Sequence, residues 1–107
     1  MTRIKVKPLS LNHAYRGRRF TTPELAAYKN IIAHLAPRLT IPEGKLWARY
    51  RFGVSSKGSD WDNLVKCTQD ALAEKYAFND NRIYRAIIEK EDVKKGGEFV
   101  EFEFGSF

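Results

Sequence analysis

Cysteine is almost absent from this chain of 107 residues, and long apolar runs are missing as well. The single cysteine, Cys67, excludes a disulfide within the chain, which is typical of proteins of the reducing cytosol. No run of about 18 apolar residues is present, so we expect no membrane-spanning helix. Residues 1–7 lack the apolar core of a secretory signal, and we therefore expect a cytoplasmic protein.

Several catalytic and cofactor-binding motifs are missing too. The sequence has no phosphate-binding glycine-rich loop, no dinucleotide fingerprint, no CxxC pair and no Ser-His-Asp pattern. The two histidines, His13 and His34, have no partner at the spacing of metal ligands, and we interpret both as non-ligands. Cys67 lies among residues of helical pattern, where a buried packing role is expected.

Acidic residues are in the minority, with 13 Asp and Glu against 19 Lys and Arg, for a net charge of +6. Such a surplus favours polyanionic partners. Nucleic acid is the first candidate, because no basic amphipathic helix favours a membrane surface. A basic soluble protein without such a partner would have the same charge balance. The length fits one domain over residues 1–107, and 43% hydrophobic residues suffice for a core.

Hydrophobic periodicity predicts the order β-α-β-α-β-β, which indicates a small α/β (α+β) domain with two helices packed on a sheet. The predicted segments are strands at 3–7, 46–54, 82–90 and 99–104 and helices at 22–36 and 60–76. Residues 10–21 are expected to form a polar loop. The turn signal at 94–97 predicts that the last two strands form a hairpin.

Two apolar stripes at helical spacing identify the candidate core of the helices. They consist of Leu25, Tyr28, Ile32 and Leu35 in the first helix and Trp61, Leu64, Val65, Thr68 and Leu72 in the second. In the central strand 46–54, alternate residues from Leu46 to Val54 are predicted to face this core. We expect Trp61 to anchor the start of the second helix and to hold the flanking carboxylates outward.

Asp60 and Asp62 bracket the start of the second helix, in the cluster Asp60-Trp61-Asp62-Asn63. Two carboxylates this close repel each other unless a cation lies between them, and Mg²⁺ prefers oxygen ligands of this kind. Acidic residues at a helix start are also ordinary caps that complement the helix dipole. The cluster alone leaves both interpretations open.

Lys66 follows Asp62 by one helical turn, and Asp70 follows Lys66 by another. A solvated row of ion pairs is one interpretation of this pattern. The other is that Lys66 stabilises the charge that develops on a scissile phosphate or orients the attacking water. Asp80, in a turn after the helix, would complete a three-carboxylate site if that turn returns beside the helix start; plain turn chemistry is the alternative.

The loop that follows the first strand is rich in cations and carries the segment His13-Ala-Tyr15-Arg16-Gly-Arg18-Arg19. Arginine side chains suit phosphate oxygens, and tyrosine can hydrogen-bond to phosphate or stack on a base. The alternative is a solvated basic loop without a ligand.

The string from Asp60 to Leu72, followed by Phe78 to Ile83, resembles the RusA family of Holliday junction resolvases. The N-terminal segment from Pro8 to Arg16 resembles the opening of the same family. The likeness runs through nearly the whole chain in the family's order. Ser59 stands where some members carry Arg, and Leu9 and Leu11 also depart from the pattern. These departures leave the acidic motif intact and concern contacts of the loops with DNA.

The resemblance implies a mixed sheet, a homodimer and cleavage of four-way DNA junctions that depends on Mg²⁺ or Mn²⁺, in DNA recombination or repair. It also implies roles for particular residues. The expected catalytic residues are Asp60, Asp62, Asp80 and Lys66, with the three acids as metal ligands, Asp70 and Asn63 in support, and Asn12, Tyr15, Arg16, Arg18 and Arg19 on DNA. Members of this kind are frequent in phages and prophages.

Two alternatives to a junction resolvase remain open. One is a non-catalytic protein that binds structured DNA through the same basic surface, with the acids acting as caps. The other is a nuclease for a different branched or flap DNA.

Overall fold

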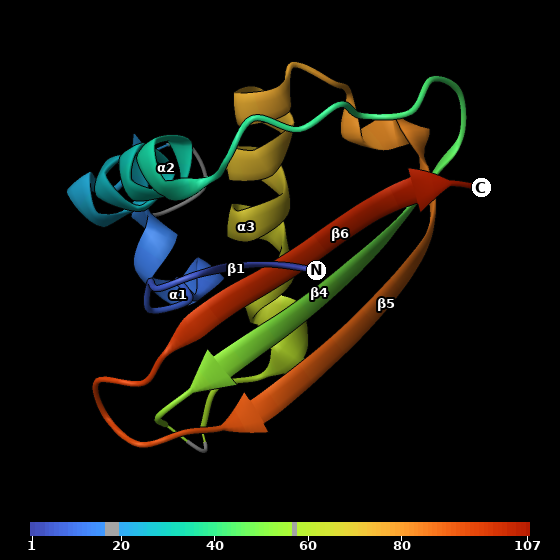
Figure 1. Ribbon diagram of the computed structural model, residues 1–107. Coiled ribbons are helices and arrows are strands. Elements are labelled where there is room, and N and C mark those ends of the chain that lie inside the picture. Colours follow the sequence, from blue (N-terminus) through green and yellow to red (C-terminus); the bar gives the residue numbers. More distant parts are fainter. Residues whose placement is uncertain (17–19, 57) are drawn as a thin grey trace.

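The structure, a computed structural model, describes residues 1–16, 20–56 and 58–107. Its centre is a four-stranded mixed sheet in the order β1-β6-β4-β5 (Figure 1). The strands are β1 (Thr2–Ile4), β4 (Leu46–Val54), β5 (Ile83–Asp92) and β6 (Phe99–Ser106). Strand β4 pairs parallel with β5 and antiparallel with β6, and β6 pairs antiparallel with β1.

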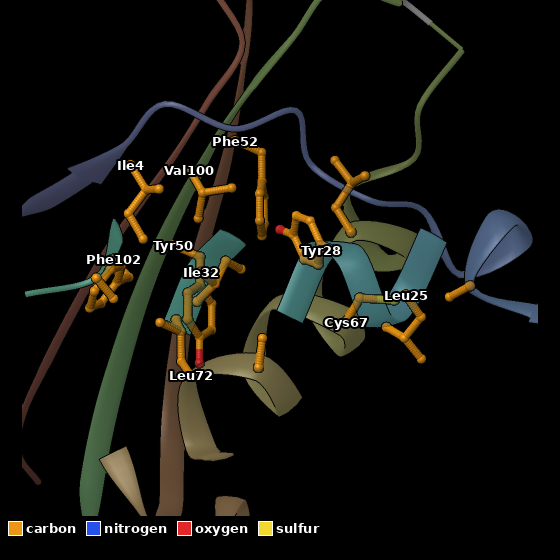
Figure 2. Packing of buried hydrophobic residues seen from close by; sticks show 14 of the residues in the cluster. Ile4, Leu25, Tyr28, Ile32, Tyr50, Phe52, Cys67, Leu72, Val100 and Phe102 are labelled. Atoms are coloured by element: carbon orange, nitrogen blue, oxygen red, sulfur yellow. The ribbon is translucent and has the colours of Figure 1, made fainter. Parts of the chain in front are cut away.

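The helices α1 (Leu11–Ala14), α2 (Pro23–Leu35) and α3 (Trp61–Tyr76) lie on one side of this sheet (Figure 1). Every second residue of β4 faces them, and these side chains are fully or almost fully buried. Figure 2 shows Tyr50 and Phe52 of β4 in one cluster with Ile32 of α2 and Leu72 of α3. The sheet and both helices therefore share one core, as the periodicity predicts.

Local sequence explains where α2 begins. Thr22 precedes it in an extended conformation, and its hydroxyl accepts a hydrogen bond from the Leu25 amide. Pro23 occupies the first turn, where its missing N–H costs nothing. Helix α3 ends at Ala77, which adopts a left-handed conformation with φ 55°. A short 3-10 turn, η1 (Asp80–Arg82), then leads into β5.

The predicted hairpin between the last two strands is wrong. Strand β6 pairs with β4 rather than with β5, so β4 lies between them. The connection 93–98 crosses the end of β4, and the Val93 amide donates a hydrogen bond to the Val54 carbonyl there at 2.8 Å. Neighbouring strands are only about 4.8 Å apart. A short connection with turn residues at 94–97 can therefore pass the end of one intervening strand as well as it can join two adjacent strands.

The predicted loop 10–21 contains short regular elements that its sequence did not indicate. They are helix α1 and an antiparallel pair of two-residue strands, β2 (Tyr15–Arg16) and β3 (Phe20–Thr21). Thr22 joins this region to α2, since its amide and hydroxyl both donate to the Ala14 carbonyl.

Two residues of the predicted helical stripes lie outside the core. Trp61 is 53% exposed, and Leu35 is exposed to the same extent. In α3 the first buried residue is Leu64, so Trp61 precedes the buried part of the helix. In α2 both Ile32 and Ala36 are buried, so Leu35 lies at the edge of the buried stripe. The expectation that Trp61 anchors the helix start from within the core is therefore wrong, whereas Cys67 is buried as predicted.

The other face of the sheet carries no helix of the described part of the chain. Its charges balance, with four arginines against four glutamates: Arg3, Arg49, Arg51 and Arg85 against Glu89, Glu91, Glu101 and Glu103. Many of these pair across strands, as Arg49 does with Glu89 at 2.9 Å. The net positive charge of the protein is therefore carried elsewhere. Across the described residues, no helix is long and apolar enough to cross a membrane.

Candidate active site

Asp60 and Asp62 both expose their carboxylates at the start of α3. Asp60 occupies the N-cap position, but within the described part of the chain its side chain makes no capping hydrogen bond. Its backbone carbonyl accepts from the Asn63 amide at 3.2 Å, and Asp62 Oδ1 accepts from the same amide at 3.0 Å. The ordinary capping role that the sequence left open for Asp60 is therefore not what its side chain does.

A hollow of about 520 Å³ adjoins Asp60 where the start of α3 meets the segment before α1. Asn63 lines it from α3, while Asn12 and His13 line it from α1. Lys7, Ser10, Glu24 and Ser59 add further polar side chains to the wall. Asn12, a predicted DNA contact, thus lies next to a predicted catalytic acid although the two are 48 positions apart in sequence.

A second polar cluster surrounds Lys66, about one helical turn beyond Asp62. The Lys66 ammonium lies 3.1 Å from Asp70 Oδ1 and 4.0 Å from Asp80 Oδ2. The turn at η1 therefore returns beside α3 at Lys66, further along the helix than the start at Asp60 and Asp62 where a three-carboxylate site would require it. Plain turn chemistry is present as well, but it belongs to Asn79, whose side chain accepts from the Asn81 amide.

Gln69 is a polar member of this cluster that sequence reasoning missed. Its Nε2 lies 3.5 Å from Asp80 Oδ2, and its Oε1 accepts a hydrogen bond of 3.0 Å from the Tyr50 hydroxyl. Burial, together with the negative charges of Asp80 and Asp70, raises the pKa of Tyr50 well above its usual value. The hydroxyl therefore stays protonated and available as a donor.

The spacing along α3 keeps the predicted acids in two groups. Asp62 and Asp70 are eight residues apart, which is about 12 Å along a helix axis. Within the described residues, no three His, Cys, Asp or Glu side chains approach closely enough to hold one metal ion together. Lys66 stands between the groups, since it follows Asp62 by one turn and contacts both Asp70 and Asp80.

The donor chemistry of these groups nevertheless fits Mg²⁺. The ion takes oxygen ligands and commonly binds only one or two protein carboxylates, with water and phosphate oxygens in its other positions. Asp60 and Asp62 are exposed at one end of the cluster, and Asp80 is partly exposed beside Lys66. Each group can therefore offer oxygen ligands to an ion that also contacts a phosphate.

The basic loop is described only in part. Tyr15 and Arg16 belong to the short strand β2, whereas Arg18 and Arg19 lie outside the described residues. His13, which the sequence predicts to be a non-ligand, lines the hollow beside Asp60. Lys7 and Ser59 also line the hollow; no motif in the sequence indicated that they would meet Asn12.

A comparison with protein families identifies a match over most of the chain. The model of the family described as Endodeoxyribonuclease RusA matches residues 6–103, which is nearly the whole chain. The match includes both polar clusters and the strands between them. A search of curated proteins found no match.

Proposed function

The chain belongs to the RusA family of endodeoxyribonucleases, and from this premise we propose that it is a metal-dependent resolvase of four-way DNA junctions. Family membership implies a Holliday junction resolvase, and hence a hydrolase of phosphodiester bonds in branched DNA. The observation that carries the proposal is the contact between Lys66 and Asp80. It sets Lys66, one helical turn beyond Asp62, against the acid of the following turn, so a cation and an acid of the family motif meet beside α3.

In the proposed mechanism, Asp60, Asp62 and Asp80 would hold one or two Mg²⁺ ions, with Mn²⁺ as a substitute. Because no three acids converge among the described residues, no single ion would be shared by all three. Such an ion supplies a water of lowered pKa and Lewis-acid stabilisation of the phosphate oxygens. Lys66 contributes a fixed positive charge beside Asp80, where charge develops on the phosphate in the transition state. Asn63 and Asp70 support these groups, Asn63 from the wall of the hollow and Asp70 through its ion pair with Lys66.

DNA would approach on the side of the helices. The uncovered sheet face has as many glutamates as arginines, so it offers phosphates no net attraction. The hollow beside Asp60 offers amide and ammonium donors from Asn12 and Lys7. Tyr15, Arg16, Arg18 and Arg19 would extend this contact along the backbone, as their residue types favour.

We further propose a homodimer, because two sites related by a two-fold axis match a four-way junction that has the same symmetry. Paired symmetric nicks follow from this arrangement. Light scattering on the purified protein should give twice the chain mass of 12.4 kDa. A monomer that persists at high concentration and on junction DNA would contradict the dimer but not the chemistry. The proposed setting is recombination or repair in the cytoplasm of a bacterial or phage-infected cell.

Cleavage of defined DNA substrates tests the proposal. The protein should nick labelled four-way junctions in Mg²⁺ and should be inactive in EDTA. Three-way junctions and flaps serve as matched substrates of the same sequence, and they should be cut more slowly. Preference for a flap or three-way substrate would favour a nuclease for other branched DNA instead.

A second candidate is a non-catalytic protein that binds structured DNA. It is favoured by the absence of a three-acid group among the described residues and by the ion pair of Asp70 with Lys66 along α3. Junction binding that persists in EDTA, without any nicking in Mg²⁺ or Mn²⁺, would support this candidate over the resolvase.

A further inference from the structure

Gln69 lies between the buried core and the proposed site. One end of its side-chain amide faces the sheet, where Oε1 accepts from the Tyr50 hydroxyl at 3.0 Å. The other end faces the turn η1, where Nε2 lies 3.5 Å from Asp80 Oδ2. The three side chains come from β4, α3 and η1, and they connect a strand of the core to a proposed metal ligand.

The orientation of this amide is fixed by its neighbours rather than by its own rotamer preference. A flipped amide would direct Oε1 at the Asp80 carboxylate, where two acceptors would repel each other. The Tyr50 hydroxyl can donate or accept, so the Asp80 carboxylate selects the orientation with the donor end of the amide toward it. Oε1 is then left to accept from Tyr50.

Tyr50 provides the rigid end of this connection. Its side chain is fully buried in the centre of the sheet, and its ring packs against Phe52 and Phe104. Asp80, in contrast, lies in a three-residue turn with a side chain that is 37% exposed. A carboxylate in such a turn gains a defined position only from groups that hold it.

We propose that Gln69, held by the Tyr50 hydroxyl, is a positioning residue that orients the Asp80 carboxylate for its work in the active site. The inference rests on the proposed function, in which Asp80 is a metal ligand. Lys66 supplies charge to Asp80, whereas Gln69 supplies direction, since an amide N–H donates along a defined line. Nothing in the sequence pattern assigns Gln69 a role.

Three variants separate this role from packing. Gln69→Met keeps the size of the side chain and removes both hydrogen bonds. Gln69→Glu keeps an acceptor for Tyr50 but sets a second carboxylate against Asp80. Tyr50→Phe removes only the hydroxyl that fixes the amide.

Tyr28→Phe is the matched control. Tyr28 is also buried, and its hydroxyl lies 2.6 Å from Thr68 Oγ1, on the residue next to Gln69 in α3. Removing that hydroxyl therefore costs a similar buried hydrogen bond on the same helix without touching Asp80. Any loss that is common to Tyr28→Phe and Tyr50→Phe reports stability alone.

The test measures single-turnover cleavage and junction affinity for these variants. For Gln69→Met and Tyr50→Phe we expect cleavage to slow about three- to tenfold at saturating DNA, the range that one ordinary hydrogen bond allows. Gln69→Glu should be the slowest, junction Kd should stay unchanged, and Tyr28→Phe should cleave at the normal rate. Equal rates for Tyr28→Phe, Tyr50→Phe and Gln69→Met would overturn the inference.

A second readout does not depend on cleavage. The side-chain amide of Gln69 gives NMR signals that should shift in Tyr50→Phe and in Asp80→Asn but not in Tyr28→Phe. Signals that stay in place in both Asp80→Asn and Tyr50→Phe would overturn the inference even in an active enzyme. Shifted signals in a protein that never cleaves a junction would support the positioning contact while contradicting the proposed function.

Discussion

Asp60 begins α3 with an exposed carboxylate that, within the described residues, makes no capping bond. Its residue type and position suit a helix cap and a metal ligand equally, so only the observed side chain separates the two roles. The motif predicted catalytic roles for both Asp80 and Lys66, which stay predictions, and their side chains lie 4.0 Å apart. Gln69 was not predictable, because its role depends on a tyrosine 19 positions away in another element.

The buried tyrosines predict a loss of stability at alkaline pH. Burial raises the pKa of Tyr28 above its ordinary value of 10.0, so the folded protein keeps a proton that the unfolded chain releases. The free energy of unfolding should therefore be unaffected by this group below about pH 10 and should fall by about 1.4 kcal/mol per pH unit above it.

Urea unfolding at pH 8 and pH 11 measures this effect. The wild-type protein should lose more stability across this range than Tyr28→Phe, which has no phenol at that position. Lysine deprotonation affects both proteins alike and cancels in the comparison. An equal loss in the two proteins would show that Tyr28 does not remain protonated in the fold.

The sequence predicted the positions of the helices and strands far better than it predicted how the strands pair. Alternation in β4 is a local signal, and the structure confirms it. The Thr22 cap is a local feature as well and explains where α2 begins. The hairpin prediction was wrong because β5 and β6 both pair with β4, which lies between them. No local pattern in the connection 93–98 indicates whether the two strands pair with each other or with a third strand. The predictions for Trp61 and Leu35 were wrong because periodicity indicates the buried side of a helix, but not which residues at its ends and edges meet the core.

Substitution of the N-cap residues of the two long helices should lower the free energy of unfolding by different amounts. Thr22→Ala removes a side chain that caps α2 and should lower the free energy of unfolding by about 1 kcal/mol. Asp60→Ala should cost less, because the Asp60 side chain makes no capping bond to α3 and contributes only through the helix dipole. Thermal and urea unfolding of both variants give the comparison. A larger cost for Asp60→Ala would restore the capping interpretation.

The surplus of positive charge is not spread evenly over the molecule, which composition alone could not reveal. The net charge of +6 indicated a polyanionic partner, and the balanced sheet face now excludes one side of the molecule from carrying that charge. The homodimer and the substrate are properties of assemblies, so neither the sequence pattern nor a single chain determines them. They stay predictions that rest on family membership and on the symmetry of the junction.

This uneven distribution of charge predicts which cations contribute to the salt dependence of DNA binding. Lys7 lines the hollow beside Asp60, whereas Arg85 lies on the sheet face. Lys7→Gln should reduce the slope of log affinity against log salt by about one, because one phosphate contact is lost. Arg85→Gln should leave the slope unchanged. Fluorescence anisotropy with a labelled junction at several salt concentrations distinguishes the two, and a reversed result would move DNA to the sheet face.

In the proposed mechanism, the acids at the start of α3 serve catalysis on DNA rather than folding. The direct test of this role is junction cleavage in Mg²⁺ by Asp62→Asn, compared with cleavage by Glu103→Gln on the sheet face. Both variants lose one negative charge. We expect Asp62→Asn to bind the junction as well as or better than the wild-type protein and to cleave none of it, while Glu103→Gln cleaves normally. Full cleavage by purified, folded Asp62→Asn would show that Asp62 is not required for catalysis.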